Sequence, residues 1–272
     1  MAASLLASGV EVHFISISFP ESGGPGGPAV VFVHGAGGDH TVWGRQIVSL
    51  RGRAGILAMD LPGHGRSGRA AEHTIPRLAA ILLETISGAG LHRPILVGHS
   101  MGGAVVLQAA LDAQAALSGV VLVDSGARLA VSPRILELLE RDPAGALRGI
   151  ARAAYAEGAP AEMIRQGEEA LAHCGADILL ADFRACNEFD VRNRVAELHL
   201  PLLAICGSED RLTVPKFSEW LVQQVPGACL HIVKGAGHLA MIERPEEVSE
   251  AILRFLGRGF VTSGATAGPV IS

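Results

Sequence analysis

The stretch Gly98-His99-Ser100-Met101-Gly102 decides the fold of this 272-residue chain. It follows an apolar run at residues 94–97 and opens a run of small and apolar residues at 103–110, which is typical of a buried helix. A serine on such a tight turn between strand and helix holds a strained backbone that lifts its hydroxyl clear of the sheet. Glycines on both sides let strand and helix approach without Cβ clashes. The stretch therefore predicts an exposed nucleophile at Ser100.

Apolar runs with the length of buried strands recur along the chain and alternate with helical patterns. Continuous apolar strands that alternate with helices predict an α/β fold with a doubly wound, mostly parallel sheet covered on both faces. Glycine and proline at 23–28 predict a turn, and we expect a frayed tail from Gly257. The expected strands are 10–19, 29–33, 55–60, 94–97, 120–124, 201–206 and 230–233, and the expected helices include 41–50, 75–87 and 245–256.

Residues 126–197 differ in character from the rest of the chain. They carry Glu and Arg at helical spacing and alanine-rich runs, without the pattern of a buried strand. Because this segment interrupts the series of strands, we expect a helical cap inserted over the carboxyl edge of the sheet. The predicted organisation is a core of residues 1–125 and 198–272 with a cap insertion at 126–197.

Composition and charge restrict the classes of function. A net charge of −5 gives no electrostatic reason to expect a nucleic acid or an anionic membrane as partner. The sequence lacks the apolar run of about 18 residues that a membrane span needs, and its first nine residues do not fit a signal peptide. The four cysteines show no C-x-x-C spacing, so we expect no metal, no other cofactor and a cytoplasmic protein.

An acid and a base follow Ser100 along the chain. A serine hydroxyl needs a base to take its proton, and an imidazole base needs a carboxylate to hold its tautomer. Asp210 and His238 each follow a buried strand, at the edge where parallel sheets build their sites. Asp124 also ends a strand and competes for the role of the acid, and Glu209 is a further candidate. We favour Asp210 over both.

These motifs, in this order, resemble the α/β-hydrolase superfamily, in particular its capped carboxylesterase-like and lipase-like soluble members. The resemblance extends over about residues 30–256. The matching segments are His34-Gly35, residues 60–67 (Asp-Leu-Pro-Gly-His-Gly-Arg-Ser), 98–103 and 207–210, and Gly237-His238.

The resemblance implies a role for each residue of a catalytic triad. Ser100 is the nucleophile, His238 the general base and then acid, and Asp210 the residue that orients it. It also implies an oxyanion hole built from the backbone N–H groups of Ala36 and Met101, with Gly37 as an alternative to Ala36.

Other polar residues in the matching segments are interpreted as structural. We expect His34, His64 and His99 to hydrogen-bond neighbouring loops, with the His99 side chain pointing away from the site. Asp60 and Arg66 are expected to brace their own loop.

The resemblance implies a serine hydrolase that cleaves a small or medium acyl ester through an acyl-enzyme on Ser100. The same machinery serves other reactions. The alternative is a carbon–carbon bond hydrolase or lyase of the meta-cleavage or menaquinone-pathway type, which would bind an anionic substrate through arginines such as Arg192 or Arg194. Pairing of these arginines with Asp190 is the simpler interpretation.

A ligand sensor derived from a hydrolase is the alternative without catalysis. Halide displacement and epoxide opening are disfavoured because they need Asp in place of Ser100.

Overall fold

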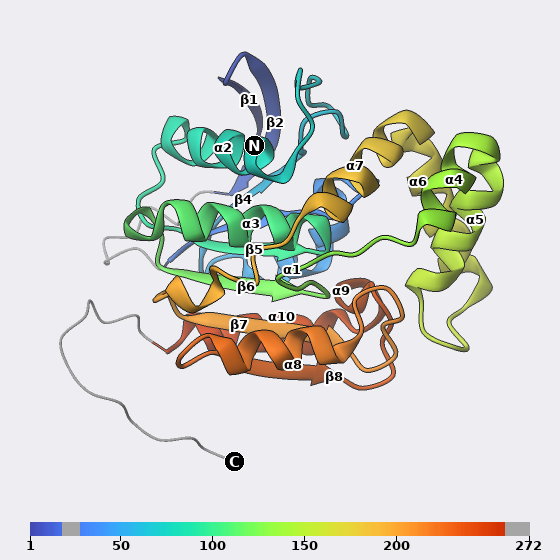
Figure 1. The fold of residues 1–272 in the computed structure, drawn as a ribbon. Helices are drawn as coiled ribbons and strands as arrows, with labels where there is room; N and C mark the ends of the chain where they lie inside the picture. The colour runs from blue at the N-terminus through green and yellow to red at the C-terminus, as the bar shows by residue number, and fades with distance from the viewer. Residues whose placement is uncertain (18–27, 259–272) are drawn as a thin grey trace.

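The computed structural model describes residues 1–17 and 28–258 (Figure 1). The predicted turn at 23–28 lies outside these residues except for Pro28, and so does the tail beyond Arg258. The last two residues of the strand predicted at 10–19 also lie outside them.

One sheet forms the centre of the described chain, with the strand order β1-β2-β4-β3-β5-β6-β7-β8. The strands from β3 to β8 run parallel, whereas β2 pairs antiparallel with both β1 and β4. The predicted α/β fold with a mostly parallel sheet is thus confirmed. The strands are β1 (Ala2–Ala7), β2 (Val10–Ile17), β3 (Ala29–Val33), β4 (Gly55–Met59), β5 (Ile95–His99), β6 (Gly119–Val123), β7 (Leu202–Gly207) and β8 (Cys229–Val233).

Strand β1 was not predicted from the sequence. Most of its side chains are exposed, so it lacks the apolar pattern of a half-buried strand. Its position comes from a two-residue turn, because Ala7 pairs with Val10 and both Ser8 and Gly9 have positive φ angles (48° and 80°). Positive φ at both central residues is the geometry of a tight hairpin turn.

Helices cover both faces of the sheet. α2, α3 and α8 pack against one apolar layer, and α1 and α10 pack against the other. The helix predicted at 41–50 is divided into a 3-10 helix, His40–Trp43, and α1. The α-helices are α1 (Gly44–Leu50), α2 (Ile75–Gly88), α3 (Met101–Asp112), α4 (Pro133–Arg141), α5 (Pro143–Ala154), α6 (Ala161–Cys174), α7 (Ala176–Glu188), α8 (Pro215–Gln224), α9 (Ala240–Glu243) and α10 (Pro245–Leu256).

The strand order changes direction between β3 and β5. These strands are neighbours in the sheet, with Val33 paired to Gly98, although β4 lies between them in the sequence. In open α/β sheets a ligand binds in the crevice outside the carboxyl ends of the strands at such a point. The loop after β3 and the turn after β5 therefore face each other at the edge of the sheet where a site is expected.

Four helices, α4 to α7, are inserted between β6 and β7 and lie beyond the carboxyl ends of the strands (Figure 1). They form a small apolar cluster of their own around Leu139, Ile150 and Leu179, against which Ala36 of the core packs. An isolated antiparallel bridge between Arg128 and Asp190 joins the two ends of the insertion. The helical insert is as expected, and the exact boundaries at 126 and 197 stay a prediction.

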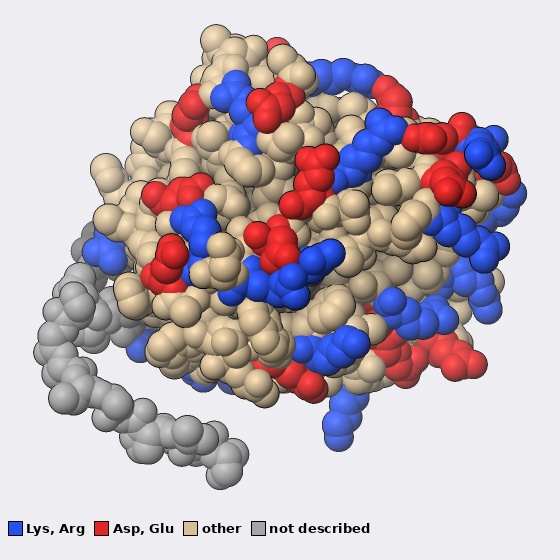
Figure 2. All heavy atoms as spheres, viewed as in Figure 1, with Lys and Arg blue, Asp and Glu red and all other residues tan. Residues whose placement is uncertain are grey.

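The surface carries interspersed charges. Figure 2 shows basic and acidic side chains intermixed on one face. The exposed ion pairs of the molecule include Arg184 with Glu140 and Arg192 with Asp190. Within the described residues, no helix combines the length and the hydropathy needed to cross a membrane.

Candidate active site

Ser100 lies on a strained turn between β5 and α3. Its φ and ψ angles are 51° and −117°, a combination that costs about 1–3 kcal/mol for a residue other than glycine. The turn is closely packed, since a Cβ on Gly98 would lie 2.3 Å from the Gly102 oxygen, and one on Gly102 would lie 2.3 Å from the His34 oxygen. Any residue larger than glycine at either position would push the strand, the helix or the loop after β3 away.

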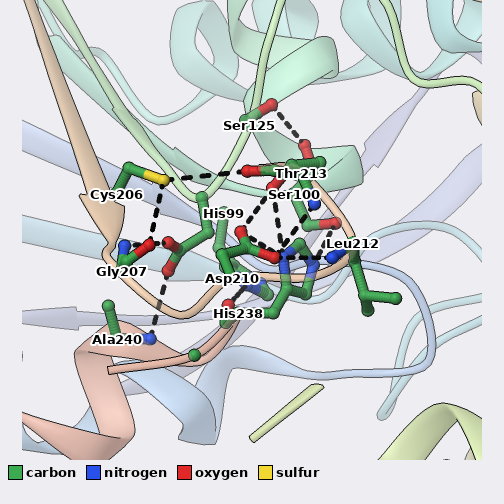
Figure 3. A network of polar contacts seen from close by, with 12 residues as sticks. His99, Ser100, Ser125, Cys206, Gly207, Asp210, Leu212, Thr213, His238 and Ala240 are labelled. Carbon is green, nitrogen blue, oxygen red and sulfur yellow. Dashed lines mark hydrogen bonds and ion pairs between the residues drawn. The ribbon is translucent and has the colours of Figure 1, made fainter. Parts of the chain in front are cut away.

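The structure brings Ser100, His238 and Asp210 together in a hydrogen-bonded chain (Figure 3). Nε2 of His238 lies 2.9 Å from Oγ of Ser100, and Nδ1 lies 2.9 Å from Oδ2 of Asp210. The carboxylate accepts from Nδ1–H, so the neutral ring presents an unprotonated Nε2 to the serine hydroxyl. In this arrangement the imidazole can take the serine proton.

The loop after β7 holds the Asp210 carboxylate with several donors. Oδ1 accepts from the N–H groups of Leu212 (2.8 Å) and Thr213 (2.9 Å), and the Thr213 hydroxyl donates to Oδ2 at 2.7 Å. Sequence reasoning missed Thr213. A sequence pattern could have indicated it. Aspartate side chains commonly accept hydrogen bonds from the backbone N–H groups two and three residues later in turns, and Thr213 is three residues after Asp210.

Burial and charge oppose each other in the ionisation of this pair. Burial alone would raise the pKa of the Asp210 carboxyl, but the nearby His238 and the hydrogen bonds from Thr213 lower it well below its usual value. Burial likewise lowers the pKa of His238, but the Asp210 carboxylate outweighs it and raises this pKa above 6.5. Asp210 thus stays ionised and stabilises positive charge on the imidazole.

Asp124, the other candidate acid, braces the loops on either side of the site. Its Oδ1 accepts from the Gly207 N–H at 2.8 Å, and its Oδ2 accepts from the Ala240 N–H at 3.1 Å. Burial, together with the nearby charge of Asp210, raises its pKa well above the usual value. The Asp124 carboxylate thus accepts from backbone groups that flank the acid and the base, whereas the Asp210 carboxylate contacts the base itself.

The candidate oxyanion donors lie in two places. Met101 is the first residue of α3, and the first N–H groups of a helix have no partner within it. In the loop after β3, the Gly37 N–H donates to Oδ2 of Asp182 at 2.9 Å and is therefore occupied. This contact favours Ala36 over Gly37 as the second donor. Because both donors are backbone N–H groups, substituting the side chain of Ala36 or Met101 would not test their role.

Two other histidines of the matching segments hold loops together. Burial lowers the pKa of His34 to about 4, and its Nε2 accepts from the Leu61 N–H at 2.9 Å. Burial also lowers the pKa of His99 to about 3, and its Nε2–H donates to the His238 carbonyl at 2.8 Å. We expected the His99 side chain to point away from the site, but it contacts the loop that carries His238. Both rings are neutral and structural.

The loop with Asp60 is braced as expected. Its carboxylate accepts from the Arg66 N–H at 3.0 Å and from the N–H of His40 at 2.9 Å.

The end of cap helix α5 is hydrogen-bonded to the loop that carries His238. The His238 N–H donates to the Ala154 carbonyl at 2.7 Å. Glu243, which is 9% exposed, accepts from the N–H of Gly237 at 2.8 Å and from that of Ala156 at 3.0 Å. Sequence reasoning missed the contacts of Ala154 and Ala156, because their partners lie more than eighty positions further along the chain and no local pattern indicates them.

A mostly apolar cavity of about 300 Å³ lies between the cap and the site. Ser100 and His238 line it together with residues of the loop after β3 and of the cap helices. Arg211 is the charged lining residue among those described, and its guanidinium donates to the carbonyl oxygens of Arg152 and Tyr155 at 2.9 and 2.8 Å. Other cap side chains in the lining include Ile135, Ile150, Tyr155, Leu171 and Phe183.

Three groups of described side chains have potential metal-ligand atoms within 4.8 Å of one another. In each group hydrogen-bond donors already occupy a carboxylate, for example Asp60, Asp182 or Asp210. Hydrogen bonds from these donors stabilise the carboxylates, so no cation is needed to explain their positions. The groups are His64, Cys174 and Asp182; Asp39, His40 and Asp60; and Asp124, Cys206 and Asp210.

Comparisons with known proteins identify the family and the fold of the chain. The model of the alpha/beta hydrolase family matches residues 30–251. A putative carbamate hydrolase, RutD, from Pseudomonas savastanoi pv. phaseolicola is 30% identical over 84% of this chain and 93% of its own. The structure of a thermophilic esterase superposes with a TM-score of 0.82 at 29% identity, covering 95% of this chain and 98% of the esterase. The enol-lactonase of Burkholderia xenovorans shares the fold, with a TM-score of 0.86 at 22% identity over 94% of this chain and all of its own.

Proposed function

Because the chain belongs to the alpha/beta hydrolase family, we propose that it is a serine hydrolase that cleaves small or medium acyl esters through an acyl-enzyme on Ser100. The observation that carries the proposal is the position of the His238 ring, which lines the cavity and lies 2.9 Å from both Ser100 Oγ and Asp210 Oδ2. Nucleophile, base and orienting acid are then in the geometry of acyl transfer.

Ser100 Oγ attacks the ester carbonyl while Nε2 of His238 takes its proton, and the oxygen of the tetrahedral intermediate is stabilised by the N–H groups of Ala36 and Met101. Each such donor contributes about 3 kcal/mol to lowering the barrier. The imidazolium then protonates the leaving alkoxide. Water activated by the same ring attacks the acyl-enzyme and releases the acid.

The cavity supports a neutral acyl group as the substrate. Its volume of about 300 Å³ lies at the small end of ligand pockets, and its lining is mostly apolar. Arg211 is the one arginine among the described lining residues, and its Nη2 donates to two backbone carbonyls of the cap, which hold it at that end of the cavity. Arg192 is paired with Asp190 in a separate surface depression. The mostly apolar lining, with Arg192 outside it, favours esters over the anionic substrates of carbon–carbon hydrolases.

Hydrolysis of p-nitrophenyl acetate, butyrate, octanoate and palmitate by the wild-type protein and by Ser100→Ala tests the proposal. We expect turnover of the shorter esters by the wild type and its loss in the variant. Negligible wild-type turnover of all four esters would contradict the proposal and favour the carbon–carbon hydrolase or sensor alternatives. Turnover that survives in Ser100→Ala would contradict the assignment of the nucleophile.

A further inference from the structure

A carboxylate of the cap reaches the loop that carries the candidate oxyanion donor. Asp182 lies on α7, is fully buried, and its Oδ2 accepts from the Gly37 N–H at 2.9 Å. Gly37 directly follows Ala36. Two residues almost 150 positions apart thus meet where the cap covers the loop after β3.

The Gly37 contact fixes the central peptide of a tight turn. The Gly38 N–H donates to the Gly35 oxygen at 3.1 Å, which closes a four-residue turn, and Gly37 at its third position has a φ of 68°. Positive φ at this position is characteristic of type II turns, whose central peptide is rotated relative to the type I form. Asp182 accepts the N–H of that central peptide and so holds it in one orientation. The adjacent peptide plane carries the Ala36 N–H.

The same carboxylate is itself held by two histidines of the core. His64 Nε2 lies 2.9 Å from Oδ2 of Asp182, and His73 Nε2 lies 2.6 Å from Oδ1. Burial lowers the pKa of His64, but the charge of Asp182 outweighs it and raises this pKa to about 10, so the pair is ionic. A buried ion with three donors has little freedom to move. The Asp182 carboxylate is therefore held rigidly enough to fix the orientation of the Gly37 peptide.

Apolar contacts hold the turn from the same side. A Cβ on Gly37 would lie 2.6 Å from Leu171 Cδ2 and 3.0 Å from Leu179 Cδ1, so the cap helices lie directly against this backbone. The turn is thus packed against the cap and hydrogen-bonded to it at the same point.

We propose that Asp182 is a positioning residue of the reaction, which acts from the cap by fixing the loop that presents the Ala36 N–H to the substrate oxygen. The inference rests on the proposed serine mechanism. It assigns the cap a part in stabilising the transition state, in addition to enclosing the acyl group. Small displacements of a group that acts on the transition state are costly, with about 100-fold in rate for a displacement of 1 Å.

The test compares three variants of α7 with p-nitrophenyl butyrate as substrate. Asp182→Ala removes the acceptor, and we expect kcat to fall roughly 10- to 100-fold with KM changed by less than about threefold. Asp182→Asn can keep an oxygen toward Gly37, and its amide can donate to Nε2 of His73 when that ring carries its proton on Nδ1, so it should recover most of kcat. Asp177→Asn is the matched control, because Asp177 also links α7 to the core, through an exposed ion pair with Arg69, and this variant should match the wild type.

A transition-state analogue separates positioning from a general structural effect. A trifluoromethyl ketone adds to the serine and places an oxyanion in the hole, so its Ki should rise in Asp182→Ala by the same factor as kcat falls. An unchanged Ki, or equal losses of kcat in Asp182→Ala and Asp182→Asn, would overturn the inference. If Asp182→Ala does not fold by circular dichroism, Asp182→Ser replaces it, since its hydroxyl is too short to reach Gly37.

A reaction that needs no ester substrate separates this inference from the proposed function. The rate at which a fluorophosphonate labels Ser100 depends on the same base and the same oxyanion donors. Labelling that slows in Asp182→Ala and recovers in Asp182→Asn would support the inference even if no ester is hydrolysed. Equal labelling rates in all variants would overturn it, and the absence of labelling in the wild type would overturn both proposals.

Discussion

The carboxylate of Asp210 is hydrogen-bonded to the ring of His238, at 2.9 Å between Oδ2 and Nδ1. Asp124 directly follows β6, the neighbour of β7 in the sheet, but its two oxygens accept from the backbone of Gly207 and Ala240. Two aspartates at adjacent strand ends thus have different partners. One is in contact with the base, and the other holds the loops that carry the acid and the base.

Asp210→Asn should lower kcat by about 10³- to 10⁴-fold with the fold intact, because an amide cannot stabilise the imidazolium or fix the productive tautomer. Asp124→Asn is the matched substitution, and we expect it to change stability more than chemistry. The test measures kcat of both variants with p-nitrophenyl butyrate and uses circular dichroism as the control for folding. Near-normal turnover in Asp210→Asn beside an inactive, folded Asp124→Asn would reverse the assignment.

The pH dependence of kcat/KM should report the pKa of His238. Burial lowers this pKa and Asp210 raises it by more, so the folded value lies above 6.5. Only the neutral ring accepts a proton from Ser100, and activity should therefore rise with pH, with a midpoint above 6.5. In Asp210→Asn the midpoint should move to lower pH, since the attraction to the imidazolium is lost. A wild-type midpoint below 6.5, or one that the substitution leaves in place, would disagree with the structure.

The cavity predicts the preferred acyl length. Butyrate and octanoate should be better substrates than palmitate, because a cavity of about 300 Å³ cannot enclose the longer chain. Phe183→Ala enlarges the lining and should shift the preference toward longer acyl groups. Leu138→Ala, on the same cap but outside the lining, is the control and should leave the preference unchanged. Efficient hydrolysis of palmitate by the wild type would argue that the cavity opens further than the structure shows.

Arg192→Ala should have little effect on kcat/KM for either neutral or singly charged esters. The guanidinium contacts Asp190 at 2.6 Å on the surface, and exposed ion pairs of this kind contribute little. The comparison uses p-nitrophenyl butyrate and the p-nitrophenyl monoester of succinate. A loss of about tenfold or more that is confined to the charged ester would instead favour an anionic substrate and the carbon–carbon hydrolase alternative.

Glu243→Ala should destabilise the protein as well as slow it, because it leaves the N–H groups of Gly237 and Ala156 without their acceptor. Each buried unsatisfied donor costs about 1–3 kcal/mol, which corresponds to several degrees in Tm for a chain of this size. Glu209→Ala is the control, since its contact with the Glu157 N–H is exposed. Equal melting temperatures for the two variants would show that Glu243 does not hold the cap to the loop of His238.

The parts of the molecule that local patterns determine were predictable. The strand–turn–helix around Ser100, the loops of Asp210 and His238 and the helical insert follow from apolar runs, glycines and turn residues that act over a few positions. The candidate triad could be named because the order of Ser100, Asp210 and His238 resembles that of α/β-hydrolases, and because parallel strands bring their carboxyl ends to one edge of the sheet.

The parts that were missed depend on contacts between distant residues. Strand β1 pairs through its backbone at the edge of the sheet and carries no apolar pattern. The direction of the His99 ring depends on the loop of His238, which lies far along the chain. Asp182 and Glu243 each bind backbone N–H groups on another element, and a backbone donor leaves no trace in the sequence.

The hydrogen bonds between Ala154, Ala156 and the loop of His238 limit how this protein can be engineered. Exchange of the segment 126–197 for that of a relative would replace the acceptor of the His238 N–H and the partner of Glu243 along with the pocket walls. In a chimaera designed only for a new pocket shape, we therefore expect the loop that carries His238 to shift and its imidazole to lose its alignment with Ser100. Libraries that vary the lining side chains of α4 and α6, and leave the end of α5 and Asp182 unchanged, are the safer route to new substrates.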